Sequence, residues 1–257
     1  MNGASLARRA LAELVGTGLL VTTVVGSGIA AARLSPHDVG LQLAENAAAT
    51  AAGLAVIILL VGPVSGGHLN PVISAVDWAL GRRSRTGLSA RDLAAYVPAQ
   101  VLGGIGGAVL ANLMFGLPAV TAAQTDRSAG HLWLGEVVAT AGLVAVVFAL
   151  VRTGRTGLVP PAVGAYIGAA YWFTSSTSFA NPAVTVGRAF SDTFAGIAPS
   201  SVPAFVGFQI VGAVVGAAFV LVAYPVGGWP AGHTDLVDRG TEAEIGRQGR
   251  RDRPVPL

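Results

Sequence analysis

Six apolar stretches, each long enough to cross a lipid bilayer, limit most strongly what this chain can fold into. They lie at roughly residues 10–32, 41–62, 93–115, 132–151, 158–175 and 203–225. A helix needs about 20 apolar residues to span the hydrocarbon core of a membrane. Only 11% of the residues are charged, whereas about a quarter are charged in an average soluble domain. The sequence therefore predicts an all-α integral membrane protein with six spanning helices.

The basic residues predict how these spans are oriented. All 16 are arginine, which, with the many Ala, Gly and Val residues, indicates a high-GC bacterial genome. Most of them precede the first stretch, lie between the second and third or the fourth and fifth, or follow the sixth. By the positive-inside rule, both termini are cytoplasmic, and we expect a multi-pass protein of the bacterial inner membrane. Because orientation explains the arginines, we expect no nucleic-acid partner.

The two halves of the chain resemble each other in sequence. "AELVGTGLLVTTVVG" matches "GEVVATAGLVAVVFA", "SGGHLNPVISAVDWAL" matches "STSFANPAVTVGRAF", and a third pair contains Gln100 and Gln209. Each half holds three spans, so the second half enters the membrane from the opposite side, as in inverted-repeat membrane proteins. We therefore predict one channel domain, residues 1–226, with repeats at about 7–115 and 131–226. The polar residues 227–257 should form a disordered cytoplasmic tail.

Two Asn-Pro pairs begin segments that are too short to span a bilayer. Pro71 and Pro182 suit the first helical position, where a backbone N–H is not needed. Asn70 and Asn181 suit the N-cap, where the side-chain oxygen accepts from free backbone N–H groups. We predict two re-entrant half-helices which, because the repeat is inverted, meet tip to tip near the membrane midplane.

The two tips and the loops before them predict a narrow polar pore. Two positive helix ends and two side-chain amides favour a solute oxygen and disfavour a cation. Non-helical backbone at membrane depth must face a water-filled path, so the carbonyl groups before each asparagine should form a ladder of acceptors. The residues that we expect to supply this pore-lining backbone are Gly66, Gly67, His68, Thr177 and Phe179.

Two acidic residues, Glu13 and Glu136, lie inside predicted spans at matching places of the two repeats. A charged side chain within a membrane is by default a functional candidate. We favour a bracing role, in which each carboxylate accepts hydrogen bonds from the re-entrant loop of its own half and holds the carbonyl ladder in place.

On these residues the sequence resembles the major intrinsic protein family of aquaporins and aquaglyceroporins. The resemblance is carried by "SGGHLNPV" and "SFANPAV", by the "AELVG" and "GEVVA" openings, and by the two glutamines, over about residues 7–226. It implies an aquaporin-like fold, a channel and a homotetramer in the lipid membrane. The pore motifs would be Asn70, Pro71, Val72 and Asn181, Pro182, Ala183, where Val72 replaces the alanine usual in the family.

The resemblance also implies a selectivity filter, and there this sequence departs from the family. Carried over by spacing, the filter consists of Thr50, Ala169, Ser178 and Val184. The last of these stands where the family nearly always has arginine. A ring with small side chains, no aromatic residue and no charge should let larger neutral solutes pass.

Two neighbouring residues are expected outside this ring. Arg188 lies one helical turn beyond Val184; it could replace the missing charge, but we expect it deeper in the wall of the outer vestibule. Tyr171, with Trp172 and Phe173, should belong to an interfacial belt or to the vestibule wall.

The segment "SFANPAVTVGRAFSDTFAGI" resembles a bacterial subgroup associated with arsenic resistance operons. This implies passive diffusion of small uncharged solutes, with arsenous acid and methylated arsenicals favoured, and with glycerol and water also conducted. A general water or glycerol facilitator is the first alternative. An inverted-repeat secondary transporter is the second, although it would need a titratable group where the two asparagines lie. The chain has no cysteine and no catalytic or metal-ligand cluster, so we expect no enzyme activity, cofactor or metal.

Overall fold

The structure, a computed structural model, describes residues 4–82 and 86–225. The predicted tail at 227–257 lies outside the described residues. Within these ranges the chain forms α-helices and two short 3-10 turns, without a strand. The helices are α1 (Leu6–Leu34), α2 (Val39–Ser65), α3 (Pro71–Gly81), α4 (Ala90–Met114), α5 (Gly130–Arg152), α6 (Val159–Phe173), α7 (Pro182–Arg188) and α8 (Val202–Ala223), and the 3-10 turns are η1 (Thr156–Leu158) and η2 (Pro199–Ser201).

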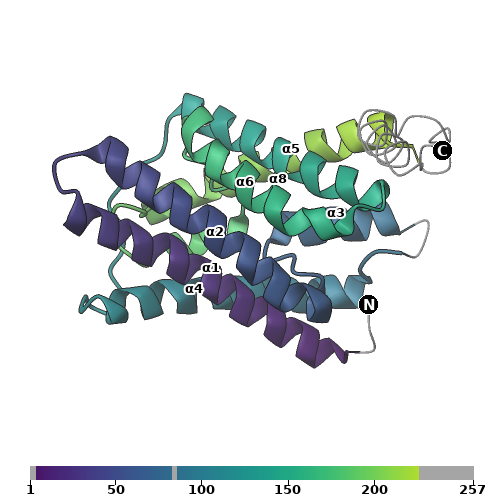
Figure 1. Ribbon diagram of the computed structural model, residues 1–257, viewed down its shortest axis with the longest axis horizontal. Coiled ribbons are helices and arrows are strands. Elements are labelled where there is room, and N and C mark those ends of the chain that lie inside the picture. The colour runs from purple at the N-terminus through teal and green to yellow at the C-terminus, as the bar shows by residue number, and fades with distance from the viewer. Residues whose placement is uncertain (1–3, 83–85, 226–257) are drawn as a thin grey trace, which may run out of the picture.

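The long helices form one elongated bundle (Figure 1). α1, α2, α4, α5 and α8 are long and apolar enough to cross a membrane. The sixth spanning helix, α6, has only 15 residues, or about 22 Å at 1.5 Å per residue. η1 precedes it directly and lengthens that end. The start of α1 and the end of α8 lie at the same end of the bundle, which we call the terminal end; the other is the distal end (Figure 1).

The inverted repeat appears in the way the helices pair. α1 packs against α4, and α5 packs in the same way against α8. Glycines make both contacts close: a Cβ at Gly107 of α4 would lie 2.2 Å from the Gly18 carbonyl of α1, and one at Gly216 of α8 would lie 2.5 Å from the Ala141 carbonyl of α5. Small residues that let helix backbones approach are typical of membrane bundles.

The half-helices α3 and α7 lie between these pairs and run in opposite directions. α3 packs against α4 and α8, and α7 packs against α4, α1 and α8. α3 leads from the middle of the bundle toward the terminal end, where α4 begins, and α7 leads toward the distal end, where α8 begins. Six spanning helices with two half-helices in an inverted repeat are thus the architecture of this chain.

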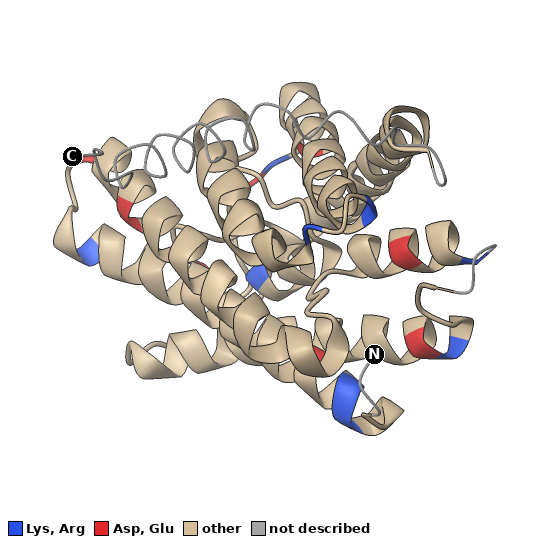
Figure 2. Cartoon of the chain, turned by 45° about the vertical axis from the view of Figure 1, so that its right-hand side comes forward, with Lys and Arg blue, Asp and Glu red and all other residues tan. Residues whose placement is uncertain are grey.

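The surface of the bundle is apolar along most of its length. Large apolar side chains that face outward include Val56, Leu59 and Leu60 on α2, Leu102 and Leu113 on α4, and Val214, Phe219 and Val222 on α8. Charged residues are few and lie mostly toward the ends of the helices (Figure 2). An apolar belt between two polar ends suits a protein immersed in lipid.

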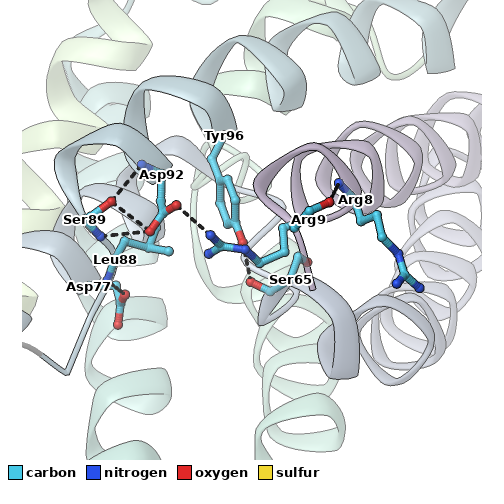
Figure 3. A network of polar contacts seen from close by, with 9 residues as sticks. Arg8, Arg9, Ser65, Asp77, Leu88, Ser89, Asp92 and Tyr96 are labelled. Carbon is cyan, nitrogen blue, oxygen red and sulfur yellow. Dashed lines mark hydrogen bonds and ion pairs between the residues drawn. The ribbon is translucent and has the colours of Figure 1, made fainter. Parts of the chain in front are cut away.

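A polar network fixes the terminal end of the bundle (Figure 3). Arg9 of α1 forms an ion pair with Asp92 of α4 at 2.7 Å, and Asp92 also completes a capping box with Ser89. The Tyr96 hydroxyl donates to the Ser65 carbonyl at 2.7 Å, where α2 ends and the loop before α3 begins. These contacts join the first, second and fourth helices on the side of the pore where that loop starts.

Candidate pore and selectivity filter

Each half-helix is capped by the asparagine before it. The side-chain oxygen of Asn70 accepts a hydrogen bond from the Val72 amide at 3.1 Å. The side-chain oxygen of Asn181 accepts from the amides of Ala183 at 2.9 Å and Val184 at 3.3 Å. Since each oxygen faces its own helix, as an N-cap requires, each NH₂ group is turned away from that helix and toward the other half.

The two NH₂ groups link the halves to each other. Asn70 Nδ2 donates to the Ala180 carbonyl at 2.8 Å. Asn181 Nδ2 donates to the Leu69 carbonyl at 2.7 Å. The half-helix tips therefore meet in the middle of the bundle and are held there by reciprocal hydrogen bonds. An amide NH₂ has two protons, so each asparagine keeps one for a solute.

An unusual backbone conformation makes this exchange possible. Leu69 has a φ of 54° and Ala180 a φ of 48°, and Thr177 and Ser178 are also in the left-handed region at 60° and 50°. Such conformations cost roughly 1–3 kcal/mol each for residues other than glycine and persist only where the surroundings hold them. They are clustered in the two loops that precede the asparagines, where they aim the carbonyl groups across the repeat.

Glu13 holds the loop before α3 by hydrogen bonds to its backbone. Its carboxylate, fully enclosed on α1, accepts from the backbone amides of His68 at 3.0 Å and Leu69 at 2.6 Å. It also accepts from the Ser65 hydroxyl at 2.6 Å and from the Gln100 amide at 2.7 Å. Every contact serves the loop or its support, so the charge is satisfied within the protein and is not offered to the pore.

Glu136 does the same for the second loop. It is fully enclosed on α5 and accepts from the backbone amides of Phe179 and Ala180, both at 2.9 Å. Gln209 of α8 donates to it at 2.6 Å and also to the Thr185 hydroxyl of α7 at 2.8 Å. The two carboxylates thus occupy equivalent places in the repeat and make equivalent contacts.

The loops leave a row of carbonyl groups without partners. Among the described residues, no hydrogen bond uses the carbonyl oxygens of Gly66, Gly67 or His68, nor those of Thr177, Ser178 or Phe179. Buried backbone carbonyls are nearly always paired. Five of the six residues, Gly66, Gly67, His68, Ser178 and Phe179, line a cavity, and their free carbonyls are explained if water or a solute pairs with them.

A cavity of about 450 Å³ runs along these loops and past both asparagine tips. It extends from Asp77 and Val159, on the terminal side, to Tyr171 and Arg188, on the distal side. Its polar face comes from the loops, with Gly66, Gly67, His68, Ser178 and Phe179 among the lining residues, while the facing wall is apolar, with Leu20, Val24, Ile58, Leu143, Phe148 and Ile167. A solute in it meets hydrogen-bonding groups mainly on the side of the loops, with Thr50 and Tyr171 as exceptions near the distal end.

The other members of the two motifs lie behind this lining. Pro71 and Pro182 begin the half-helices as expected from their fixed φ. Val72 and Ala183 are buried, with 4% and 0% of their surface exposed, and pack inside the bundle. Thr177, which we expected to line the pore, is outside the cavity lining.

The structure brings together three of the four filter residues inferred from spacing, and replaces the fourth. Thr50, Ser178 and Val184 all line the distal part of the cavity. Ala169 does not; it is on the exposed face of α6. In its place stands Tyr171, which is 3% exposed, lines the cavity and shares a hydrogen bond of 3.2 Å with the Thr50 hydroxyl. The cavity beside Thr50 thus contains an aromatic side chain, contrary to our expectation, and the burial of Tyr171 excludes a place in an interfacial belt.

Arg188, which we expected in the wall of the outer vestibule, lines the distal part of the cavity. It ends α7, is only 2% exposed and lines the same cavity as Val184. Its guanidinium lies over the Phe179 ring, 3.5 Å from the centroid, and its Nε donates to the Ala195 carbonyl. The distal part of the cavity, where we infer the constriction of the pore, therefore carries a positive charge, although position 184 does not supply it.

A second arginine lies beyond the first, in the loop between α4 and α5. Arg127 packs over the same Phe179 ring at 4.9 Å. Its Nε donates to the Gly196 carbonyl at 3.2 Å and its Nη1 to the Ser176 carbonyl at 3.5 Å. Burial lowers the pKa of its guanidinium below the ordinary value. Arg127 is outside the cavity lining, so its contacts support the loops around the constriction.

Comparisons with known proteins agree with this architecture. The family model for major intrinsic proteins matches residues 1–178. "Aquaglyceroporin AqpS" of Rhizobium meliloti (strain 1021) is 50% identical over 214 residues, which cover 83% of this chain and 89% of the relative. "Glycerol uptake facilitator protein" of Pseudomonas aeruginosa is 31% identical and covers 76% of this chain and 77% of its own. A solved aquaglyceroporin from Plasmodium falciparum shares the fold, with a TM-score of 0.64 at 19% identity over 84% of this chain and 96% of that chain. The chain belongs to the major intrinsic protein family.

Proposed function

We propose that this protein is a passive channel for small uncharged solutes. The observation that carries the proposal is the single cavity along which two asparagine amides and the free carbonyl groups of both loops are arranged. Relatives of the chain are named as an aquaglyceroporin, a glycerol uptake facilitator and aquaporin Z. Water and glycerol are therefore the first solutes to expect.

The mechanism follows from the two unlike walls of the cavity. A neutral hydroxylated molecule can exchange hydrogen bonds with water for hydrogen bonds with the loop carbonyls and the asparagine NH₂ groups. The apolar wall has no groups that could replace the water molecules around an ion, so an ion would lose most of its hydration there. At the tips a cation meets the NH₂ groups of both asparagines and the positive ends of both half-helices.

The composition of the constriction favours solutes larger than water. Val184 replaces the arginine usual in the family, and Thr50 and Ser178 are small, so that Tyr171 and Arg188 set the free space. We propose that arsenous acid and methylated arsenicals, which are small, rich in hydroxyl groups and mostly uncharged near neutral pH, pass together with glycerol and water. A general water and glycerol facilitator remains the alternative within the same class.

A secondary transporter is less consistent with the site. Such a protein needs a coupling ion or a titratable group near the midplane. At that depth the cavity holds two asparagines, and the nearby carboxylates of Glu13 and Glu136 are occupied by hydrogen bonds to backbone and glutamine groups. We propose no catalytic role for either carboxylate.

The experiment is stopped-flow light scattering on proteoliposomes without an ion gradient, with water, glycerol and arsenous acid as solutes. We expect all three to permeate, which an ion-coupled transporter would not allow. In Val184→Arg, a second guanidinium beside Arg188 should reduce glycerol and arsenous acid permeation about tenfold or more and water permeation less. Equal rates for Val184→Arg and the wild type with every solute would place the constriction elsewhere.

The apolar outer surface and the arginine distribution support two further parts of the proposal. We propose a homotetramer in the bacterial inner membrane, with the terminal end in the cytoplasm and the distal end outside. Chemical crosslinking in membranes tests the oligomer, and labelling of a single cysteine placed in the α4–α5 loop tests the orientation.

A further inference from the structure

The distal constriction holds a buried positive charge that has no acidic partner. Arg188 is 2% exposed, and among the described residues the only ion pair is that of Arg9 with Asp92. An isolated buried charge is costly unless something solvates it. Water or a solute must therefore solvate this guanidinium, and the cavity that Arg188 lines is where it can reach the side chain.

The geometry of the side chain shows which of its groups face that cavity. Nε is used by the Ala195 carbonyl, and the flat face of the guanidinium rests on Phe179. Neither terminal amino group forms a hydrogen bond with a described residue. Neither is fully enclosed, so both keep some accessible surface. Both are thus held in position by the rest of the side chain and open to the cavity.

Arg127 differs from Arg188 in each of these respects. Two of its three guanidinium nitrogens donate to backbone carbonyls, those of Gly196 and Ser176. It lies outside the cavity lining. Although both arginines pack on Phe179, only Arg188 presents free donors to a passing solute.

We propose that Arg188 is the cation-excluding and oxygen-binding residue of the filter, acting from the end of α7 in place of an arginine at position 184. This rests on the proposed function, because it names a selective residue of the same pore. The two open amino groups donate to the acceptor oxygens of a neutral solute, and the Thr50–Tyr171 hydroxyl pair can accept its hydroxyl proton. A cation that approaches this point is repelled by a fixed unit charge that has no ion-pair partner among the described residues.

The position also explains how the filter can be both charged and wide. An arginine at 184 would stand in the ring itself, whereas Arg188 starts one turn further along α7, lies against Phe179 and leaves the space beside Val184 open. The charge needed against cations is kept, and the room needed for larger solutes is gained. Permeation should be fastest for solutes rich in acceptor oxygens, because the amino groups of Arg188 donate from the wall of the cavity and do not block it.

The test is an ion-leak assay on proteoliposomes, with potassium and proton flux measured under an imposed diffusion potential. Thermal unfolding in detergent shows whether each variant is folded, and glycerol permeation is measured on the same vesicles as the ion leak. Two neutral variants, Arg188→Gln and Arg188→Met, remove the charge with different residual packing, so that either one that folds decides the question. Arg188→Lys keeps the charge, and Arg127→Gln is the matched control at the second arginine on the same ring.

The neutral variants should leak cations about tenfold faster than the wild type, as expected for removing a unit charge about 10 Å from the ion at an effective dielectric constant of about 20. Arg188→Lys and Arg127→Gln should stay within about twofold of the wild type. Arg188→Gln combined with Val184→Arg should regain ion exclusion, because the charge returns to the constriction. Neutral variants that conduct glycerol and remain as ion-tight as the wild type would overturn the inference. A wild type that conducts no neutral solute would instead overturn the proposed function.

Discussion

Glu136→Gln tests whether the enclosed carboxylates hold the re-entrant loops. In the wild type one oxygen accepts from the Phe179 amide, and the other accepts from the Ala180 amide and from Gln209, at distances of 2.6 to 2.9 Å. A glutamine keeps one acceptor oxygen and places an NH₂ group in the position of the other. If the oxygen faces Ala180 and Gln209, the new NH₂ group meets the Phe179 amide, donor against donor.

The expected loss follows from these three contacts. A hydrogen bond to a charged group contributes about 1.5–3 kcal/mol and one between neutral groups about 0.5–1.5 kcal/mol, while a buried donor left without a partner costs about 1–3 kcal/mol. Weakening two bonds and losing the third gives roughly 3–5 kcal/mol. Burying a neutral side chain is easier than burying a carboxylate, which offsets part of this. The net destabilisation should be about 2–4 kcal/mol, or a fall in Tm of about 5–15 °C.

The assay is thermal unfolding in detergent together with glycerol permeation in proteoliposomes. The control is Thr140→Val, one turn further along α5, since the Thr140 hydroxyl is enclosed and has no hydrogen-bond partner among the residues that the structure describes. We expect Thr140→Val to be nearly neutral in both measurements. We expect Glu136→Gln to lower both Tm and flux, because the loop that contains the left-handed Ala180 loses its hydrogen bond at Phe179 and keeps only a weaker one at Ala180. A Glu136→Gln protein with the Tm and flux of Thr140→Val would refute the bracing role.

Two further predictions concern packing and pH. Gly107→Ala places a Cβ 2.2 Å from the Gly18 carbonyl, so α1 and α4 must separate, and thermal unfolding should show a loss of about 1–3 kcal/mol; Gly106→Ala, whose Cβ meets nothing within 4 Å, should be neutral or slightly stabilising. Hydrogen bonds from Ser128 and Ser201 hold the pKa of Asp126 below its usual range. A depressed carboxyl pKa stabilises above the ordinary value of about 4 and ceases to do so as pH falls through the lowered one. In hydrogen-exchange measurements corrected for the intrinsic pH dependence, the amides around Asp126 should be less protected in acid than at neutral pH. Asp126→Asn should remove this difference.

The scaffold of the pore could be predicted from the sequence because its parts are local or repeated. An Asn-Pro pair specifies a helix start in itself, and a glutamate in the same place of two inverted halves has few alternatives to supporting those halves. The structure places Asn70 and Asn181 tip to tip. It also places Glu13 and Glu136 beneath the loops of their own halves. None of these contacts depends on the length of a particular loop.

The filter could not be predicted in the same way, because its position on α6 was counted back from Asn181 through an irregular loop. The count gave Ala169, and the structure gives Tyr171. At 100° per residue, an error of two residues rotates a side chain by about 200°, which moves it from the pore to the outer face of the helix. The left-handed residues Thr177 and Ser178 shape that loop, and no residue type in the sequence signals them.

For Arg188, in contrast, the sequence did contain a signal of its place. Residues one turn apart on a helix lie on the same face, so an arginine that follows Val184 by one turn faces the same cavity whenever α7 reaches that far. α7 ends at Arg188. What the sequence does not show is the contact of Arg188 with the Phe179 ring, which keeps the long side chain close to the constriction.

Arg188 also shows where the two halves of the duplicated scaffold stop being equivalent. Its counterpart on α3 is Asp77, which lines the same cavity near the terminal end and accepts a hydrogen bond from the Leu88 amide at 2.7 Å. The repeat thus gives one backbone arrangement and opposite charges at its two ends. The half-helix tips disfavour a cation in both halves alike, and Arg188 adds a positive charge at the distal end only. Substitutions of Arg188 should therefore change which solutes pass, while substitutions in the symmetric bracing should change whether any solute passes.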